Sequence, residues 1–365
     1  MAIKGYKVEP DYATPPGDTL REIIEQNEMT QVDLADRLGM AEQTISKIVK
    51  GAAPITPETA SKLEFVFNID SSFWNNLETN YKEAIEEKRK QEELKKQVEL
   101  IKQIPYNELV KNGAIKKESD PQSKVESILK FFGFASFDYF EKSLEKNSLL
   151  AGAYRASTTS EINKYALMSW VRHGEIKASK IETEIFSKSL AVESIPKLRE
   201  LTNEVDPAIF IPELQKVCSA FGVAVVLVPE VKGSRVCGLT RWLTPYPKAI
   251  LQLSLRYKTN DSLWFTFFHE LCHIIKHSKQ PYYTLSKDYK TSKEEVEADA
   301  FAANTLIPKD DYSKLLLKAP YTRMIIKEFA EEVGIHPGIV VGRLQNDREI
   351  EWSQFNDLKA RYEWT

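Results

Sequence analysis

The chain has few cysteines, no long apolar run and no surplus of positive charge. Its three cysteines are odd in number, widely spaced and without a CxxC pair, so the sequence indicates neither a disulfide framework nor a cysteine-based zinc site. It contains no run of roughly eighteen apolar residues, as a membrane span would need, and its opening, MAIKGYKVEP, lacks the apolar segment of a signal peptide. We therefore expect a cytoplasmic protein with no membrane partner.

Acidic and basic residues are nearly balanced. Lysine and arginine number 50 and aspartate and glutamate 53, which gives a net charge of -3. This balance argues against a globally basic nucleic-acid coat, although one small domain can still bind DNA through a local patch. A chain of 365 residues with 42% hydrophobic content can form two or three domains. We expect a multidomain, mainly α-helical protein.

Residues 15–70 have the pattern of several short helices in succession. Segments such as TQVDLADRLG and AEQTISKIVKG begin with a capping signal and place apolar residues at helical spacing. Gly39 falls between two of these segments, where a sharp turn needs a residue that tolerates positive φ. The pattern is typical of a helix-turn-helix domain. We expect its core to contain Leu20, Ile23, Ile24, Val32, Leu34, Leu38, Ile45, Ile48, Leu63 and Val66.

The next 140 or so residues predict helices without obvious chemistry. Residues 71–104 have no glycine or proline, and their charged middle part predicts a solvated helical spacer, with a dimerising coiled coil as the alternative. His173 stands alone in the following region and is interpreted as a surface or packing residue. The domains we expect are a helix-turn-helix domain over 1–80, a charged helical linker over 81–104, a helical middle region over 105–215 and a domain with a sheet over 216–365.

Three short runs then change the hydrophobic period from that of helices to that of strands. They are VAVVLVPE (223–230), SRVCGLTRWL (234–243) and KAILQLSLR (248–256), separated by glycine and proline signals. In the last run, leucines alternate with polar residues, which predicts strands with one buried face. A small sheet therefore precedes the next helix, and we expect an α+β domain.

The segment FTFFHELCHIIKHS places His269 and His273 four residues apart in an apolar helical setting. Residues four apart lie on one side of a helix, so both imidazoles can bind one zinc ion. Glu270 is turned by about 100° and can reach a water at that ion as a general base. His277 lies roughly 12 Å from His269 along the helix axis, too far to share the ion. The segment predicts zinc-dependent hydrolysis of an amide.

A third ligand has to come from elsewhere, and SKEEVEADAFAANTLIP supplies three glutamates. Glu295 and Asp299 share a helix face, so Glu295 can bind the metal while Asp299 accepts the outward N–H of a ligand histidine. Glu294 and Glu297 have different helical phases. We therefore predict Glu295 as the third ligand and Asp299 as its supporting residue.

The segments WFTFFHELCHIIKH and EVEADAFAANTLIP resemble those of the ImmA/IrrE family of zinc metallopeptidases. The resemblance implies a gluzincin-like domain in which His269, His273 and Glu295 bind Zn²⁺ and Glu270 is catalytic. It also implies cleavage of a protein substrate, a repressor or antitoxin-like regulator. A strand edge at 238–242 would hold an extended peptide. The candidates for a contact with substrate or an oxyanion are His277, Arg241, Tyr282 and Tyr283.

The first eighty residues resemble HigA-type antitoxins of the Xre-like helix-turn-helix class, in TQVDLADRLGMAEQTISKIVKG and FWNNLETNY. The resemblance implies a homodimer that reads an operator on DNA, with a recognition helix over 41–50. It places Gln43, Thr44 and Lys47 toward base edges or phosphates, and Gln31 near the backbone. Residues 1–77 hold 7 Lys/Arg and 12 Asp/Glu, a net of 7 - 12 = -5, so a protein-docking role stays open as the alternative.

Together these features predict a DNA-binding regulator fused to a zinc metalloendopeptidase. The alternative is a transcriptional regulator or antitoxin whose zincin-like domain is a non-catalytic sensor or docking module. Zinc binding and the effect of replacing Glu270 distinguish the two.

Overall fold

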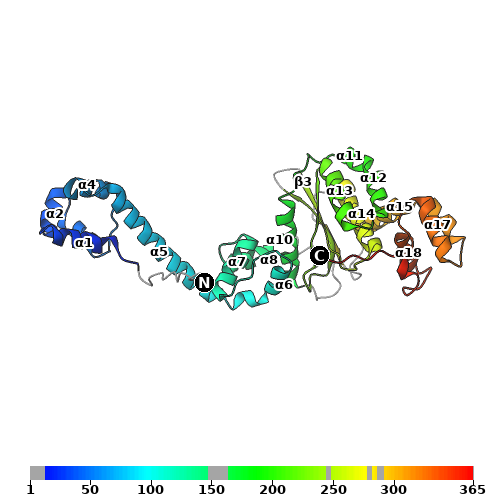
Figure 1. Cartoon of the computed structure of the whole chain (residues 1–365), viewed down its shortest axis with the longest axis horizontal. Coiled ribbons are helices and arrows are strands. Elements are labelled where there is room, and N and C mark those ends of the chain that lie inside the picture. The colour runs from blue at the N-terminus through cyan, green and yellow to red at the C-terminus, as the bar shows by residue number, and fades with distance from the viewer. Residues whose placement is uncertain (1–12, 147–162, 244–247, 278–281, 286–291, 365) are drawn as a thin grey trace, which may run out of the picture. The chain divides into compact units, whose positions relative to one another are not determined.

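The computed structural model describes residues 13–146, 163–243, 248–277, 282–285 and 292–364. The chain divides into two compact units, Met1–Val98 and Glu99–Thr365 (Figure 1). It is mostly helical and has one small mixed sheet in the second unit, as the sequence predicts. Within the described residues, no helix is both long enough and apolar enough to cross a membrane.

The N-terminal unit is a bundle of short helices followed by one long helix. A capping box starts its second helix: Thr30 Oγ1 accepts from the amide of Asp33 at 3.1 Å, and the Asp33 carboxylate accepts from the amide of Thr30 at 3.0 Å. Gly39 ends that helix at φ 61°, so the turn has the left-handed residue that the sequence predicts. The helices are α1 (Pro16–Gln26), α2 (Gln31–Leu38), α3 (Glu42–Val49), α4 (Pro57–Phe67) and α5 (Ser71–Gln97).

The core of this bundle contains nearly all of the expected residues. Ile23 and Val66 are partly buried against it, and most of the others are fully buried. The prediction that Val32 belongs to the core is wrong, because its side chain is 48% exposed. Helix α2 buries Leu34 and Leu38, and a residue two positions before Leu34 lies on the opposite face of the helix. Trp74 of α5 is fully buried and completes the core instead.

Helix α5 continues well beyond the bundle as a charged helix. Its buried residues are Trp74, Glu78 and Leu94, and Glu78 accepts from the amide of Ile55 at 3.0 Å. Ion pairs at helical spacing, such as Lys90 with Glu87 at 3.6 Å, cover the stretch between Glu78 and Leu94. An exposed charged surface of this kind is what a solvated helix needs.

The C-terminal unit is built around a four-stranded sheet with the order β1-β3-β2-β4. β1 pairs with β3 in parallel, whereas β2 pairs with both β3 and β4 in the antiparallel direction. The strands are β1 (Val223–Leu227), β2 (Val236–Leu243), β3 (Lys248–Leu253) and β4 (Tyr282–Leu285).

Helices precede and follow these strands in the chain. Before the sheet come α6 (Tyr106–Lys111), α7 (Pro121–Phe132), α8 (Phe137–Lys146), α10 (Lys164–Ala178), α11 (Lys188–Glu193), α12 (Ile195–Glu200) and α13 (Pro207–Ala220). After β3 come α14 (Asn260–Lys276), α15 (Lys293–Leu306), α16 (Lys309–Leu316), α17 (Arg323–Val333) and α18 (Pro337–Asn346). Short 3₁₀ turns occur at Leu100–Gln103, Leu201–Asn203 and Asn356–Leu358.

Both faces of the sheet are covered, which corrects the expectation of a single buried face. Leu251 and Leu253 of β3 pack in the main core with α13 and α14. On the other face, Gln252 is only 1% exposed because α10 covers it, and its Nε2 donates to the carbonyl of Trp170 at 2.8 Å. The helical middle region thus packs on the sheet within one compact unit.

The strand order also overturns the predicted peptide-binding edge. β3 pairs with residues 238–242 of β2 on one side and β4 pairs with Gly238, Leu239 and Thr240 on the other, so β2 is not an edge among the described strands. Strand order depends on pairing between distant segments, and β4 follows α14 in the chain. The edges among the described strands are β1 and β4.

Candidate metal centre

Helix α14 carries the predicted histidines in its buried C-terminal half. It begins at Asn260, and Thr259 is its N-cap. One side of the helix packs Trp264, Phe268 and Leu271 into the main core. The opposite side faces α15 and β2, which have many contacts with α14. The apolar side therefore fixes the direction in which the polar side points.

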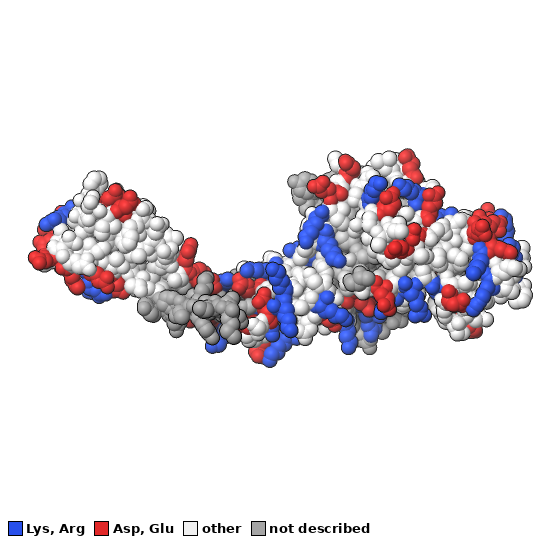
Figure 2. All heavy atoms as spheres, in the orientation of Figure 1, with Lys and Arg blue, Asp and Glu red and all other residues white. Residues whose placement is uncertain are grey.

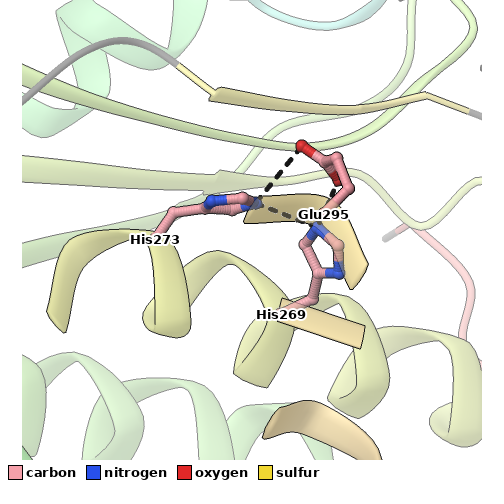
Figure 3. Close-up of side chains that lie close together, drawn as sticks. All are labelled: His269, His273 and Glu295. Carbon is pink, nitrogen blue, oxygen red and sulfur yellow. Dashed lines mark hydrogen bonds and ion pairs between the residues drawn. The ribbon is translucent and has the colours of Figure 1, made fainter. Parts of the chain in front are cut away.

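Three side chains from α14 and α15 converge on one point (Figure 3). His269 Nε2 lies 3.0 Å from Glu295 Oε2 and 3.1 Å from His273 Nε2, and His273 Nε2 lies 3.5 Å from Glu295 Oε1. All three residues are buried, and their ligand-type atoms lie within 4.8 Å of one another. Ser292 caps α15 by accepting from the amide of Glu295 at 3.3 Å, which sets Glu295 in the first turn of the helix.

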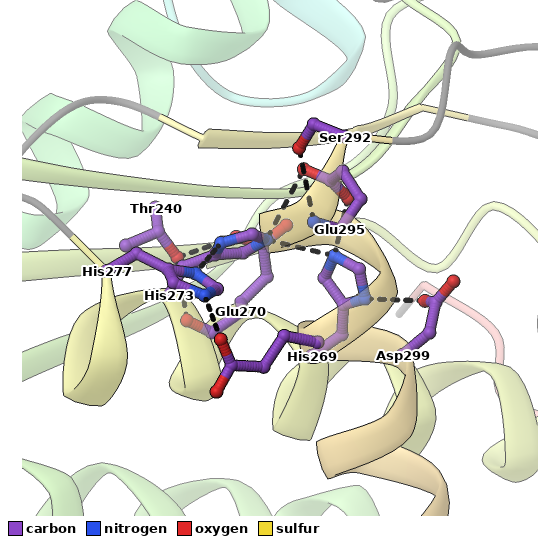
Figure 4. A network of polar contacts seen from close by, with 9 residues as sticks. Thr240, His269, Glu270, His273, His277, Ser292, Glu295 and Asp299 are labelled. Atoms are coloured by element: carbon purple, nitrogen blue, oxygen red, sulfur yellow. Dashed lines mark hydrogen bonds and ion pairs between the residues drawn. The ribbon is translucent and has the colours of Figure 1, made fainter.

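The outward nitrogen of each histidine ring also has a partner (Figure 4). His269 Nδ1 donates to Asp299 Oδ1 at 2.9 Å. His273 Nδ1 lies 2.7 Å from His277 Nδ1, and His277 Nε2 lies 3.4 Å from Glu297 Oε2. Because the Nδ1 atoms are engaged in this way, the two Nε2 atoms are left to face Glu295 and each other. This is how protein metal sites orient their histidine ligands.

The pKa values of the two candidate ligand histidines are shifted in opposite directions. Burial lowers the pKa of His269, but hydrogen bonds to Asp299 and Glu295 outweigh it and raise this pKa to about 10. Burial and the charge of His269 together lower the pKa of His273 to about 2. The two neighbouring rings therefore differ strongly in their affinity for a proton. Two imidazole nitrogens and a carboxylate are the donors that Zn²⁺ prefers, and a bound cation displaces such a proton, so the residues fit the metal.

Glu270 is fully buried beside the cluster and faces the sheet rather than joining the ligand set. Its Oε2 accepts from Thr240 Oγ1 of β2 at 2.6 Å. Gly238 of β2 makes room for it, because a Cβ at this glycine would lie 2.6 Å from Glu270 Oε1 and 2.7 Å from Thr266 Cγ2. The close approach of β2 to α14 therefore holds the carboxylate in place.

The sequence did not predict three contacts at this centre. Thr240 and Gly238 lie in β2, and a glycine inside a strand pattern is a signal for close approach of another element. His277 was interpreted as a helix-end residue, and it is the C-cap of α14. Its contact with His273 Nδ1 follows from their spacing of four residues.

The remaining candidates are not in the group of described residues that could hold a metal. Arg241 forms an ion pair with Glu175 of α10, and it belongs to the paired strand β2. Tyr282 and Tyr283 are in β4, but their side chains lie outside the described part. Glu294 is exposed, and Glu297 pairs with Lys276 at 2.9 Å. His173 is buried in α10, and burial together with Lys177 and Lys180 lowers its pKa to about 4.

The candidate DNA-binding residues lie on the surface of the N-terminal unit. Gln43 and Lys47 are exposed on α3, Thr44 beside them is half-buried, and Gln31 is the first residue of α2. Ile45 and Ile48 anchor the opposite side of α3 in the core. Figure 2 shows acidic and basic side chains interspersed on this unit, without a broad basic face among the described residues on the side in view.

Comparison with known proteins gives matches at both ends of the chain. Residues 20–74 match the helix-turn-helix family, and residues 218–345 match the peptidase M78 family, described as the IrrE N-terminal-like domain. Over 73 residues the chain is 32% identical to the uncharacterized HTH-type transcriptional regulator YddM of Escherichia coli (strain K12), a match that covers 20% of this chain and 78% of the relative.

Solved structures match the N-terminal part as well. PA4674 from Pseudomonas aeruginosa, in complex with its operator DNA, is 28% identical over 20% of this chain and 81% of its own, with a TM-score of 0.20. An addiction module antidote protein of a HigA family from Coxiella burnetii is 28% identical over 25% of this chain and 91% of its own, with a TM-score of 0.20. By these matches, the chain carries a helix-turn-helix domain of the transcriptional-regulator type in its N-terminal part and an IrrE N-terminal-like domain in its C-terminal part.

Proposed function

We propose that the chain is a DNA-binding regulator whose C-terminal domain is a zinc-dependent endopeptidase acting on a protein substrate. The observation that carries this proposal is the convergence of His269, His273 and Glu295, with Glu270 held beside them. Burying these polar groups together is costly unless they bind a common ligand. The family match over residues 218–345 supports the same interpretation.

In this proposal His269, His273 and Glu295 hold the zinc ion, and Asp299 and His277 fix the two rings. Zinc at such a site lowers the pKa of water and polarises a carbonyl group. Glu270 acts as the general base that takes a proton from the attacking water, and Thr240 and Gly238 determine where its carboxylate lies. The fixed position of Glu270 is the contribution of the chain itself, because a general base works only within hydrogen-bond reach of its proton.

An extended segment of the substrate would add to strand β4. β4 lies at the edge of the sheet and contacts α14, whereas β2 is paired on both sides. Strand addition at an edge gives main-chain hydrogen bonds along the substrate and fixes its direction. By analogy with the family, the substrate is a repressor or antitoxin-like regulator.

The N-terminal domain would bind operator DNA through α3. Its core residues orient Gln43, Thr44 and Lys47 outward, as a recognition helix requires. The YddM relative is described as an HTH-type transcriptional regulator, which supports this part of the proposal. Because residues 1–77 carry a net charge of 7 - 12 = -5, affinity would depend on two copies binding two half-sites as a homodimer.

The test compares Glu270→Gln with the wild-type chain in cells, by mapping new protein termini across the proteome. The substitution keeps the size of the side chain but removes the base, so cleavage should fall by about 10²- to 10⁴-fold while zinc stays bound. Glu294→Gln on the exposed face of α15 is the matched control and should cleave normally.

Two results would contradict the peptidase. One is a Glu270→Gln chain that produces the same termini at the wild-type rate. The other is a wild-type chain that binds zinc, regulates its operator and produces no termini that the variant lacks. The second result would instead favour a non-catalytic sensor or docking module.

A further inference from the structure

A pocket of about 650 Å³ lies in the C-terminal unit between α14, α15 and α18. Its size is that of sites for small organic molecules, which range over about 300 to 1,000 Å³. It lies toward the N-terminal half of α14, so it is distinct from the point where His269, His273 and Glu295 converge. Apart from Asp299, no residue of its lining has a role proposed above.

Much of the lining is apolar, and aromatic side chains stand in its wall. Tyr257 is 43% exposed and Trp352 is 54% exposed, and Phe265 is half-buried with its ring centroid 6.3 Å from that of His269. Exposed aromatic rings beside a pocket offer flat surfaces on which a planar molecule can stack. Ala303 of α15 contributes a small side chain that leaves part of this space open.

The polar part of the wall favours a donor rather than an acceptor. Asp261 Oδ1 is buried without a hydrogen-bond partner among the described residues, while its Oδ2 accepts from Lys359 Nζ at 2.7 Å. A buried acceptor without a partner is costly, and a ligand N–H would satisfy it. Arg343 pairs with Asp347 at 2.6 Å. Asp299 also lines the pocket; its Oδ1 pairs with His269 at 2.9 Å, and its side chain is 43% exposed, so a ligand can still contact it.

Asp299 links this pocket to the metal centre. It lines the pocket and also accepts from His269 Nδ1 at 2.9 Å. A cationic ligand beside Asp299 would compete with that hydrogen bond and loosen the orientation of His269. Partners of this kind typically change metal affinity by about 10- to 100-fold when they are lost.

We propose that this pocket binds a small molecule with a flat apolar body and an amidinium-type cationic group, and that its binding weakens the hold of the metal centre on zinc. The flat body stacks between the aromatic rings, and the cationic end donates to Asp261 Oδ1 and Asp299. Through Asp299 the molecule acts as a negative regulator of the zinc site.

The test uses three probes with the same ring and different charge: benzamidine, benzamide and benzoate. Their binding to the full-length zinc-loaded chain is measured by isothermal titration and ligand-observed NMR. Benzamidine should bind at least about tenfold more tightly than benzamide, and benzoate weakest, because a charge-assisted hydrogen bond is about twice as strong as a neutral one. Equal binding of all three probes would overturn the proposed chemistry.

Variants then locate the site. Ala303→Phe fills the pocket and should abolish binding, Trp352→Ala removes a stacking surface and should weaken it, and Asp310→Asn on exposed α16 is the control that should change nothing. Circular dichroism checks that each variant is folded. Benzamidine binding that survives both pocket variants would overturn the assignment.

The coupling has its own measurement, which does not depend on cleavage. Saturating benzamidine should lower zinc affinity by at least about fivefold, as measured by competition with a chromophoric chelator. Benzamide at equal concentration is the matched control. Zinc affinity that is unchanged by bound benzamidine would overturn the regulatory half of the proposal. Glu295→Gln should bind benzamidine normally even if it binds no metal, because Glu295 does not line the pocket.

Discussion

The recognition surface of the N-terminal unit and the metal centre of the C-terminal unit place their polar residues in opposite ways. On α3, the candidate DNA contacts Gln43 and Lys47 are exposed, so water already satisfies their hydrogen-bonding groups. At the metal centre, His269, His273 and Glu295 are buried and satisfied by one another and by neighbouring side chains such as Asp299 and His277. Buried polar groups need partners, so their geometry points to a ligand, whereas exposed groups accept many arrangements.

The largest effect should come from replacing a residue of the buried cluster. Glu295→Gln removes the carboxylate charge at the point where three side chains converge, so zinc affinity should fall by more than the roughly 100-fold expected for a supporting residue. Competition with a chelator measures the change. Glu294→Gln on the exposed face of the same helix is the control. Equal losses of zinc affinity in both variants would show that the buried and the exposed carboxylate contribute equally to zinc binding.

The next largest effect should come from Gly238, the glycine of β2 that lies against Glu270. Gly238→Ala places a Cβ 2.6 Å from Glu270 Oε1, so the Glu270 carboxylate must shift. A shift of about 1 Å in a catalytic group can cost on the order of 100-fold in rate. Cleavage of a substrate identified by the proteome comparison should therefore fall about that much, while zinc affinity stays within about twofold of the wild type. Unchanged cleavage would show that β2 does not position Glu270.

A buried histidine away from the cluster offers a smaller, pH-dependent effect. Burial, with Lys177 and Lys180, lowers the pKa of His173 from 6.5 to about 4, so the folded chain binds fewer protons there than the unfolded chain. Stability from this residue is present above pH 6.5 and is lost as the pH falls toward 4. Between pH 6.5 and 5 the loss should be about 2 kcal/mol.

Urea unfolding of the wild type and of His173→Gln at the two pH values measures this difference. The variant should lose less stability on acidification than the wild type does. Identical acid dependence in both chains would mean that His173 is already solvated in the folded state.

The smallest effect should come from the exposed surface of α3. Lys47→Ala removes one exposed positive charge, so DNA affinity should fall by roughly threefold to tenfold and the salt dependence should lose about one unit of slope. Fluorescence anisotropy with operator DNA at several salt concentrations measures both. Lys88→Ala on exposed α5 is the control. An equal effect of the two variants would point to general electrostatics rather than a recognition helix.

What the sequence could predict depends on how local each feature is. The spacing of His269 and His273 places them on one helix face whatever surrounds them, and Gly39 ends α2 through its own backbone conformation. Predicting Glu295 as a ligand required the helical phase of a second helix, and the face that it shares with Asp299 suggested that phase. The packing of α15 on α14 then brings Glu295 to the histidines.

The expectations that were wrong concern pairing and burial between distant segments. Residues 238–242 do not form an edge, because β4 joins β2 from beyond α14. Gln252 is buried, because α10 covers the second face of the sheet. Val32 is exposed, since the inward phase of α2 is set by its packing in the bundle. Alternation along one segment does not report which other segments will cover it.

The most direct measurement is the zinc content of the purified full-length chain after dialysis, determined by inductively coupled plasma mass spectrometry beside a His269→Ala, His273→Ala double variant. The account predicts close to one zinc per wild-type chain and almost none in the double variant, with both chains folded by circular dichroism. A folded wild-type chain that holds no zinc when supplied with it, or a double variant that holds as much as the wild type, would contradict the metal centre on which the proposed function depends.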